Sequence, residues 1–358
     1  MRKILVFYSK TGSGHLRAAQ ALKEEIEANP PAGVSIEVVL QEGLGKARMG
    51  VKTDPSFAYA LFSSKLQGFY NFIYVVTNNK LGVKLLRLFI RGVWGKNLRQ
   101  IIDSEKPDLI ITTHHHISPQ TVGRSKHKAP FINIVTDLGY PHIIWFDKNL
   151  DKIITPTEVI SKYAQALTKG QSNKIVHIDY PLKNHFKTIK KEGFSNTLLV
   201  LGGGLGSGNI KKQVEVLLDN FPSKKIVVVC GENKKLFKEL DSRLSAGNDN
   251  LEVHGYVDHL MELYQEADII LTKAGPGTIV ECAVLKKPLI ITSWIGMQEK
   301  DNVDFVVDNH LGVYVPDPRK LPGAINRVYA SYDKYTQGNS LFSDGTKKIV
   351  EYILKGYS

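Results

Sequence analysis

The chain has 358 residues, 42% of them hydrophobic and 23% charged, which is ordinary for a folded globular protein and long enough for two domains. The two cysteines, Cys230 and Cys282, are too few for a disulfide framework. No apolar run reaches the roughly 18 residues of a membrane-spanning helix, and residues 1–8 indicate a strand rather than a signal sequence. We therefore expect a cytoplasmic protein with buried thiols, whose unevenly distributed net charge of +12 suggests an anionic partner.

The first half of the chain predicts alternating strands and helices. An apolar strand at residues 4–7 leads through a glycine turn to His15, and residues 16–27 have the apolar spacing of a helix. Further strands are expected at 36–40, 108–112, 131–135 and 152–154.

Two polar side chains in this half stand where strands end, and both are candidates for chemistry. His15 closes the first glycine turn at a helix start, where a neutral imidazole can serve as a general base for a hydroxyl. Asp137 follows the strand near residue 135 and could orient His15 or accept the proton itself. The alternatives are a capping histidine and a turn-initiating aspartate.

The run His114–His116 raises the question of a metal. Alternate residues of a strand point the same way, so His114 and His116 could share an ion, but no third ligand stands at a sensible spacing. No two aspartates are separated by one residue, so the Asp-x-Asp element of many metal-dependent sugar-nucleotide transferases is absent. We expect no metal.

The positive charge concentrates in residues 55–102, which contain no acidic residue, seven cations and nine aromatic residues. Helical spacing predicts a basic amphipathic helix that suits an anionic membrane surface. The alternatives are a core-packed helix with a solvated basic face and a nucleic-acid surface, for which no recognised motif is present. The candidate membrane residues are Lys80, Lys84, Arg87, Arg91 and Trp94.

In the second half, four apolar strands each run into glycine. They end in the segments 197–208, 225–231, 251–257 and 269–281, and the last continues from a Gly-Pro-Gly turn into a helix. A glycine turn that opens a helix directs backbone N–H groups at one point, which suits a diphosphate. The spacing fits neither the Gly-x-Gly-x-x-Gly dinucleotide pattern nor a Walker loop.

These patterns predict an α/β protein with two doubly wound, Rossmann-like domains facing across a cleft. We expect an N-terminal domain at residues 1–180, a polar linker at 181–196, a C-terminal domain at 197–340 and a closing helix at 341–358.

The motifs together resemble the monogalactosyldiacylglycerol synthase and processive diacylglycerol glucosyltransferase family, which has the GT-B fold and belongs to glycosyltransferase family 28. Residues 272–281 are similar to the plant-type synthase signature, and residues 200–208, 229–231, 255–257 and 296–303 match in order. The first half contributes the anchors at residues 11–15, 136–137 and 145–146. Residues 179–186 depart from the family pattern and lack its glycine and arginine, which puts the hinge geometry in doubt.

The resemblance implies a role for each matched position. It places uracil near Gly255, Tyr256 and Val257, the ribose on Glu281, and the transferred sugar on Gln298 and Glu299. His15 becomes the base, with Asp137 as the second candidate. The remaining donor-binding positions, around the diphosphate and its neighbouring loops, are Gly203, Gly204, Gly231, Lys273, Gly275, Pro276, Gly277 and Thr278.

The implied activity is an inverting transfer of galactose or glucose from UDP to the 3-hydroxyl of 1,2-diacylglycerol, without a metal or other cofactor, by an enzyme peripheral to the inner face of the cell membrane. The partners are thus a UDP-sugar, diacylglycerol and an anionic membrane, and not nucleic acid. Three alternatives remain: an N-acetylglucosaminyltransferase acting on a polyprenyl-linked peptidoglycan precursor, a UDP-N-acetylglucosamine 2-epimerase, and a non-catalytic sensor of UDP-sugars.

Overall fold

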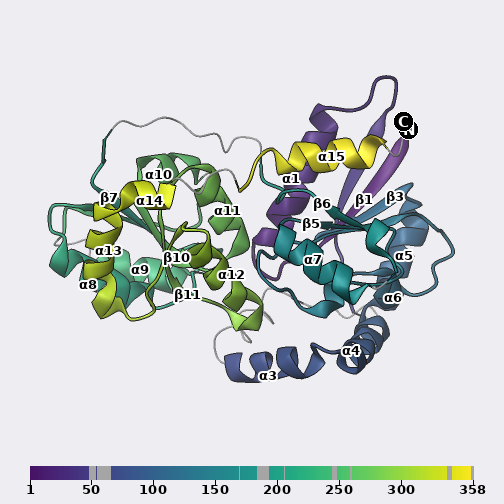
Figure 1. Cartoon of the computed structure of the whole chain (residues 1–358), viewed down its shortest axis with the longest axis horizontal. Helices are drawn as coiled ribbons and strands as arrows, with labels where there is room; N and C mark the ends of the chain where they lie inside the picture. The colour runs from purple at the N-terminus through teal and green to yellow at the C-terminus, as the bar shows by residue number, and fades with distance from the viewer. Residues whose placement is uncertain are drawn as a thin grey trace. The chain divides into compact units, whose positions relative to one another are not determined.

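The computed structural model describes residues 1–47, 54, 66–168, 170–183, 193–204, 206–243, 248–258, 260–336 and 341–355 (Figure 1). Parts of several predicted segments lie outside these residues, among them 55–65 of the basic segment, 184–192 of the linker, 205 of the first glycine segment of the second half and 356–358 of the last helix. The chain forms two compact units. The first comprises Met1–Asn184, Gly296–Gln298 and Asp344–Ser358, and the second comprises His185–Ile295 and Glu299–Ser343.

The first unit is built on a six-stranded parallel sheet in the order β2-β1-β3-β4-β5-β6. The strands are β1 (Arg2–Tyr8), β2 (Ile36–Glu42), β3 (Leu109–Thr112), β4 (Phe131–Ile134), β5 (Lys152–Thr155) and β6 (Ile175–His177). The helices are α1 (Gly14–Ala28), α3 (Gln67–Thr77), α4 (Lys80–Val93), α5 (Gly95–Glu105), α6 (Pro119–Val122), α7 (Glu158–Leu167) and α15 (Gly345–Lys355), with short 3-10 turns at η2 (Ile143–Trp145) and η3 (Ser172–Lys174).

Both faces of this sheet are buried, which explains why its strands are continuous apolar runs rather than alternating ones. In β1, Ile4 and Val6 pack on one face with residues of α1 and α15, while Leu5 and Phe7 pack on the other with residues of α5 and α7. Helices α1 and α15 lie side by side (Figure 1). The predicted closing helix therefore completes one core of the first unit.

The second unit repeats the plan, with a parallel sheet in the order β12-β11-β10-β7-β8-β9. Its strands are β7 (Thr197–Leu201), β8 (Lys225–Val229), β9 (Leu251–His254), β10 (Ile269–Lys273), β11 (Leu289–Ser293) and β12 (Gly312–Tyr314). Its helices are α8 (Ile210–Asn220), α9 (Lys234–Arg243), α10 (Met261–Glu266), α11 (Pro276–Val284), the 3-10 turn η5 (Pro318–Lys320), α13 (Leu321–Ala330) and α14 (Tyr332–Thr336). Helix α12 (Gly296–Asp308) belongs to this unit from Glu299 onward, while its first three residues are grouped with the first unit.

The predicted α/β class and the two doubly wound sheets are confirmed. The strands expected from apolar runs are present in both halves, as are the helix after the Gly-Pro-Gly turn and the helix through the basic segment. Cys230 and Cys282 are buried free thiols, as expected, and burial raises the pKa of the Cys230 thiol to about 11.

Candidate active site

The strand order of each sheet locates a binding edge before any side chain is considered. In the first unit the chain moves from β1 outward to β2 and then returns to β3 on the other side of β1. In the second it moves from β7 to β8 and β9 and then returns to β10 beside β7. Ligands of open α/β sheets bind at such reversals, beyond the carboxyl ends of the two strands. The predicted base and the predicted diphosphate loops lie at these two points.

His15 lies in the first turn of α1, directly after the β1 loop. Gly12 gives that loop its turn, because its backbone has a positive φ of 86°. The His15 Nδ1 atom lies 2.6 Å from the carbonyl oxygen of Thr113, which follows β3, and 3.0 Å from Oγ1 of Thr136, which follows β4. The loops after three strands therefore meet on one imidazole.

These contacts determine which nitrogen of His15 carries the proton. A carbonyl oxygen only accepts hydrogen bonds, so Nδ1 must donate to Thr113 and the lone pair lies on Nε2. Burial lowers the pKa of His15 to about 4, against a smaller opposing effect of the Thr113 carbonyl. The imidazole is thus neutral near pH 7, with Nε2 available to accept a proton.

Asp137, the second candidate base, lies near the end of β4 and is half-buried. One of its carboxylate oxygens, Oδ2, accepts a hydrogen bond of 2.7 Å from the indole Nε1 of Trp145. The Trp145 ring lies 6.4 Å from that of His15. Nδ1 of His15 lies against Thr113 and Thr136, and a role for Asp137 in orienting His15 or accepting its proton stays a prediction.

Three histidines after β3 gather beside His15, and the candidate ligand atoms of His15, His114 and His115 lie within 4.8 Å of one another. Hydrogen bonds occupy both nitrogens of His114. The backbone N–H of His116 donates to its Nδ1 (3.2 Å), so Nε2 carries the proton and donates to Oγ1 of Thr11 (2.9 Å). In this hydrogen-bond arrangement His114 therefore has no free lone pair to offer to an ion.

His115 is a feature that the sequence analysis did not single out. Its ring stacks on that of His114 at 4.4 Å and lies 5.3 Å from the ring of Trp145. Within the described part of the chain, no hydrogen bond of its ring nitrogens is found. Burial, and the neighbouring histidines, lower its pKa well below the usual value, so it is a neutral polar group facing His15. The three-histidine run at a strand end was the available signal.

The glycine loops of the second unit come together at the reversal between β7 and β10. Gly203 and Gly231 have positive φ values of 66° and 58°, which favour glycine. A Cβ on Gly231 would come within 2.5 Å of the carbonyl oxygens of both Gly203 and Gly204, so the loops after β7 and β8 touch through backbone alone. Helix α11 opens next to them at Pro276, with Gly275 as its N-cap.

Lys273, the last residue of β10, lies across these loops. Its Nζ would be 3.3 Å from a Cβ on Gly275, and its Cε 2.9 Å from one on Gly203. The ammonium group forms an ion pair with Oε1 of Glu299, whose Oε2 accepts from the backbone N–H of Ile295 (2.9 Å). The side chains are 16% and 5% exposed, so the pair places one cation and its counter-charge at the glycine loops.

The remaining predicted donor positions lie on the same edge or on α12. Glu281 is 3% exposed in α11, and its Oε2 accepts a hydrogen bond of 2.7 Å from Tyr264. Tyr256 is 55% exposed after β9, next to Gly255, around which a Cβ would find open space. The other positions, all half-buried, are Val257, Gly277, Thr278 and Gln298.

Helices α3 and α4 carry exposed apolar side chains on an outer surface of the first unit. Their exposed fractions run from 44% for Val76 to 66% for Leu81. We call this surface the α3–α4 apolar surface; it comprises Phe69, Phe72, Val75, Val76, Leu81, Leu85, Leu88 and Phe89. In the part of the chain that the structure describes, no helix combines the length and the hydropathy that a membrane span requires.

The five predicted membrane residues divide into two groups. Lys80, Lys84 and Arg91 are exposed. Arg87 turns inward, where its Nη2 donates to the carbonyl of Ile144 (3.0 Å), and burial lowers its pKa. Trp94 also turns inward, and its indole N–H donates to the carbonyl oxygen of Leu44 (3.0 Å). Arg87 and Trp94 therefore attach α4 to the fold and do not belong to the exposed surface.

Two family models match the two halves of the chain. Residues 15–178 match the monogalactosyldiacylglycerol (MGDG) synthase model, and residues 197–340 match the glycosyltransferase family 28 C-terminal domain. The chain belongs to the MGDG synthase family. It is a glycosyltransferase, with its candidate base in the first of these regions and its glycine loops in the second.

Individual relatives agree with this family over most of the chain. A probable MGDG synthase 2 of Oryza sativa subsp. japonica is 26% identical over 95% of this chain and 76% of its own length. The processive diacylglycerol β-glucosyltransferase of Bacillus subtilis is 25% identical over 99% of this chain and 95% of its own length. The crystal structure of MurG from Acinetobacter baumannii has the same GT-B fold, with a TM-score of 0.59, 13% identity and coverage of 99% and 100% of the two chains.

Proposed function

We propose that this family member moves galactose or glucose from a UDP-sugar to the 3-hydroxyl of 1,2-diacylglycerol, with inversion at the anomeric carbon and without a metal. The observation that carries the proposal is the neutral His15, whose Nδ1 proton is committed to Thr113 and whose Nε2 is available. The choice of diacylglycerol as the acceptor is supported by the relatives, which are named as MGDG synthases and as a diacylglycerol glucosyltransferase.

In the proposed reaction, His15 Nε2 removes the proton of the diacylglycerol hydroxyl as its oxygen attacks the anomeric carbon on the face opposite UDP. The transition state has oxocarbenium character, as in glycoside chemistry generally. Thr113 and Thr136 keep the imidazole in the tautomer that can accept this proton. Glu281 would hold the ribose and Gln298 the transferred sugar.

The diphosphate would lie over the Gly275–Thr278 turn, beside the Gly203 loop and the Lys273 ammonium group. Negative charge that develops on the leaving UDP would then meet backbone N–H groups at the start of α11, together with one cation. This arrangement supplies by fixed dipoles what a divalent ion supplies in metal-dependent transferases. We therefore propose that no cofactor is needed.

The membrane would hold the acceptor, and the α3–α4 apolar surface with Lys80, Lys84 and Arg91 is the proposed contact with an anionic bilayer on the cytoplasmic side. The resemblance of the 272–281 signature to plant-type synthases favours galactose as the donor sugar. It also favours this activity over the polyprenyl acceptor, the epimerase and the sensor.

The stereochemistry tests the proposed mechanism directly. Donors with an α-linked sugar should give only the β-anomer, as read from the anomeric proton coupling in the NMR spectrum of the extracted glycolipid. Turnover with EDTA present should equal turnover without it. An α-linked product would refute the single displacement, and loss of activity in EDTA that added metal restores would refute the metal-free site.

A further inference from the structure

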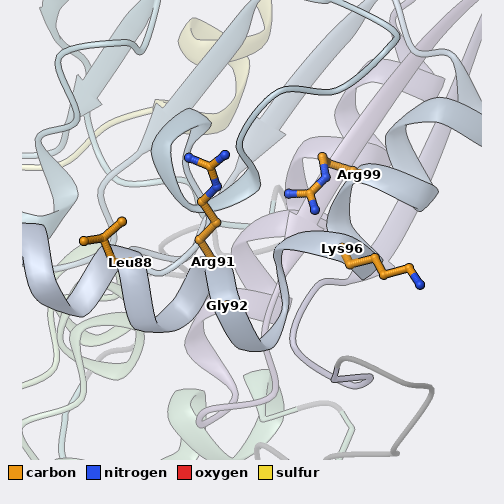
Figure 2. Close-up of a pocket in the computed structure, with 5 residues that line it drawn as sticks. All are labelled: Leu88, Arg91, Gly92, Lys96 and Arg99. Atoms are coloured by element: carbon orange, nitrogen blue, oxygen red, sulfur yellow. The ribbon is translucent and has the colours of Figure 1, made fainter.

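A basic hollow lies on the outside of the first unit, where α4 ends and α5 begins. It has a volume of about 400 Å³ and is lined by Leu88, Arg91, Gly92, Lys96 and Arg99 (Figure 2). Its polar lining is entirely cationic. None of the residues that line this hollow belongs to the His15 site or to the glycine loops, and none has a part in the proposed transfer.

Figure 2 shows the guanidinium groups of Arg91 and Arg99 near one another, while the Lys96 side chain points away from both. Arg99 is half-buried, and its Nη1 donates a hydrogen bond of 2.6 Å to the carbonyl oxygen of Val122 at the end of α6. That bond fixes the guanidinium group, which has five N–H donors, and leaves others of them for a ligand.

Glycines make room for the arginines. A Cβ on Gly123, whose φ is +79°, would come 2.7 Å from Nε of Arg91. A Cβ on Gly95 would come 3.1 Å from Cγ of Arg91 and 3.2 Å from Nη1 of Arg99. The two guanidinium groups therefore rest against backbone that carries no side chain, and a substituent at either glycine would displace them.

Two of the three cations of the hollow have no partner in the described part of the chain. The side chains of Arg91 and Lys96 form no hydrogen bond and no ion pair within the part of the chain that the structure describes. No acidic residue occurs in the sequence between Pro55 and Ile102. Cations held close together without carboxylates are disfavoured by mutual repulsion, so an anion with several acceptor oxygens would stabilise them.

We propose that this hollow binds the phosphate group of an anionic membrane phospholipid. Two guanidinium groups that approach from different sides match the several oxygens of a phosphate better than the single plane of a carboxylate. The choice of a lipid over free phosphate rests on Leu88, which lines the hollow, is 54% exposed and belongs to the α3–α4 apolar surface. This inference rests on the proposed membrane contact: it adds one specific binding position for a lipid headgroup to the general attraction between the cations and an anionic bilayer.

Two double variants with equal loss of charge separate a headgroup site from diffuse attraction. Arg91→Gln with Lys96→Gln removes two cations from the hollow, and Lys80→Gln with Lys84→Gln removes two exposed cations of α4 that do not line it. All four side chains are exposed, so both variants should fold, which thermal melting verifies. Arg99 is left intact because its bond to Val122 supports the fold.

The measurement is co-sedimentation with phosphatidylcholine vesicles that contain either phosphatidic acid or oleate, adjusted to the same surface potential. The assay contains neither UDP-sugar nor diacylglycerol, so its outcome is independent of the transferase activity. We expect the Arg91/Lys96 variant to bind phosphatidic acid vesicles about tenfold more weakly than the Lys80/Lys84 variant, because it loses directed contacts to phosphate as well as charge. On oleate vesicles the two variants should bind alike.

Equal losses on both kinds of vesicle would overturn the proposal in favour of diffuse attraction. Titration of the native protein with inorganic phosphate, followed by calorimetry, distinguishes the source of the phosphate. Saturable binding that the Arg91/Lys96 variant loses, together with no preference for phosphatidic acid vesicles, would assign the hollow to a soluble phosphate and refute the lipid.

Discussion

His15→Asn tests the proposed base most sharply, because asparagine reproduces one half of the imidazole. Its side-chain N–H₂ group can take the place of Nδ1–H and donate to the carbonyl oxygen of Thr113, which lies 2.6 Å from Nδ1 in the native protein. Nothing replaces Nε2. The variant should therefore keep the local hydrogen bond, worth about 1 kcal/mol, and lose the proton acceptor.

The expected cost in turnover is that of removing a general base, about 10²- to 10⁴-fold, which corresponds to about 3–5 kcal/mol in the activation barrier. Initial rates with varied UDP-sugar and saturating diacylglycerol measure this as a fall in kcat. The affinity for UDP should stay within about twofold, because the predicted UDP loops belong to the other unit. Asp137→Asn is the matched variant, since an asparagine oxygen can still accept from Trp145.

Retention of turnover within about threefold of the native rate in His15→Asn would refute His15 as the base. A much larger loss in Asp137→Asn than in His15→Asn would transfer the role to Asp137. A parallel loss of UDP affinity and turnover would mean that the change had disturbed the fold rather than the chemistry, and a lowered Tm would accompany it.

Three further predictions follow from neighbouring contacts. Thr136→Val removes the oxygen 3.0 Å from Nδ1 of His15 and should lower kcat about fivefold, as one lost hydrogen bond predicts; unchanged kinetics would mean that Thr113 alone orients the ring. Lys273→Met leaves Glu299 buried without its cation and should lower the free energy of unfolding by about 3 kcal/mol, as measured in urea. Adding Glu299→Gln should restore much of the lost free energy, and additive losses in the double variant would contradict a coupled pair. Burial holds the pKa of His15 at about 4 in the folded protein, below its unfolded value near 6.5. The unfolded state therefore binds more protons, and the free energy of unfolding should fall as the pH drops from 6.5 toward 4. In His15→Asn that loss of free energy should be smaller by up to about 2–3 kcal/mol, and an unaltered loss would contradict the assignment.

The local patterns in the sequence were sufficient to predict the α/β fold and the strand ends at which the candidate residues lie. An apolar run that ends in glycine is a local signal, and parallel strands bring such ends to one edge. Gly203, Gly231, Gly255 and Gly275 were predicted in this way, and the structure places the loops after β7, β8, β9 and β10 along one sheet edge. The 3.6-residue period likewise predicted α4.

What the sequence did not reveal depends on contacts between distant segments. The tautomer of His15 is determined by the carbonyl oxygen of Thr113, 98 positions away. Arg87 has the same helical spacing as its exposed neighbours, but the backbone of Ile144 lies against its side of the helix and turns it inward. Periodicity defines the faces of a helix, and only the tertiary fold decides which face is covered.

The central claim, transfer from a UDP-sugar to diacylglycerol, is tested most directly by product formation in anionic liposomes that contain 1,2-diacylglycerol. UDP-galactose, UDP-glucose and UDP-N-acetylglucosamine are offered in turn, with EDTA present. We predict a monohexosyl-diacylglycerol from UDP-galactose or UDP-glucose, abolished in His15→Asn, and the preferred donor identifies the sugar. The absence of glycolipid from every donor, in a preparation that binds UDP, would contradict the account.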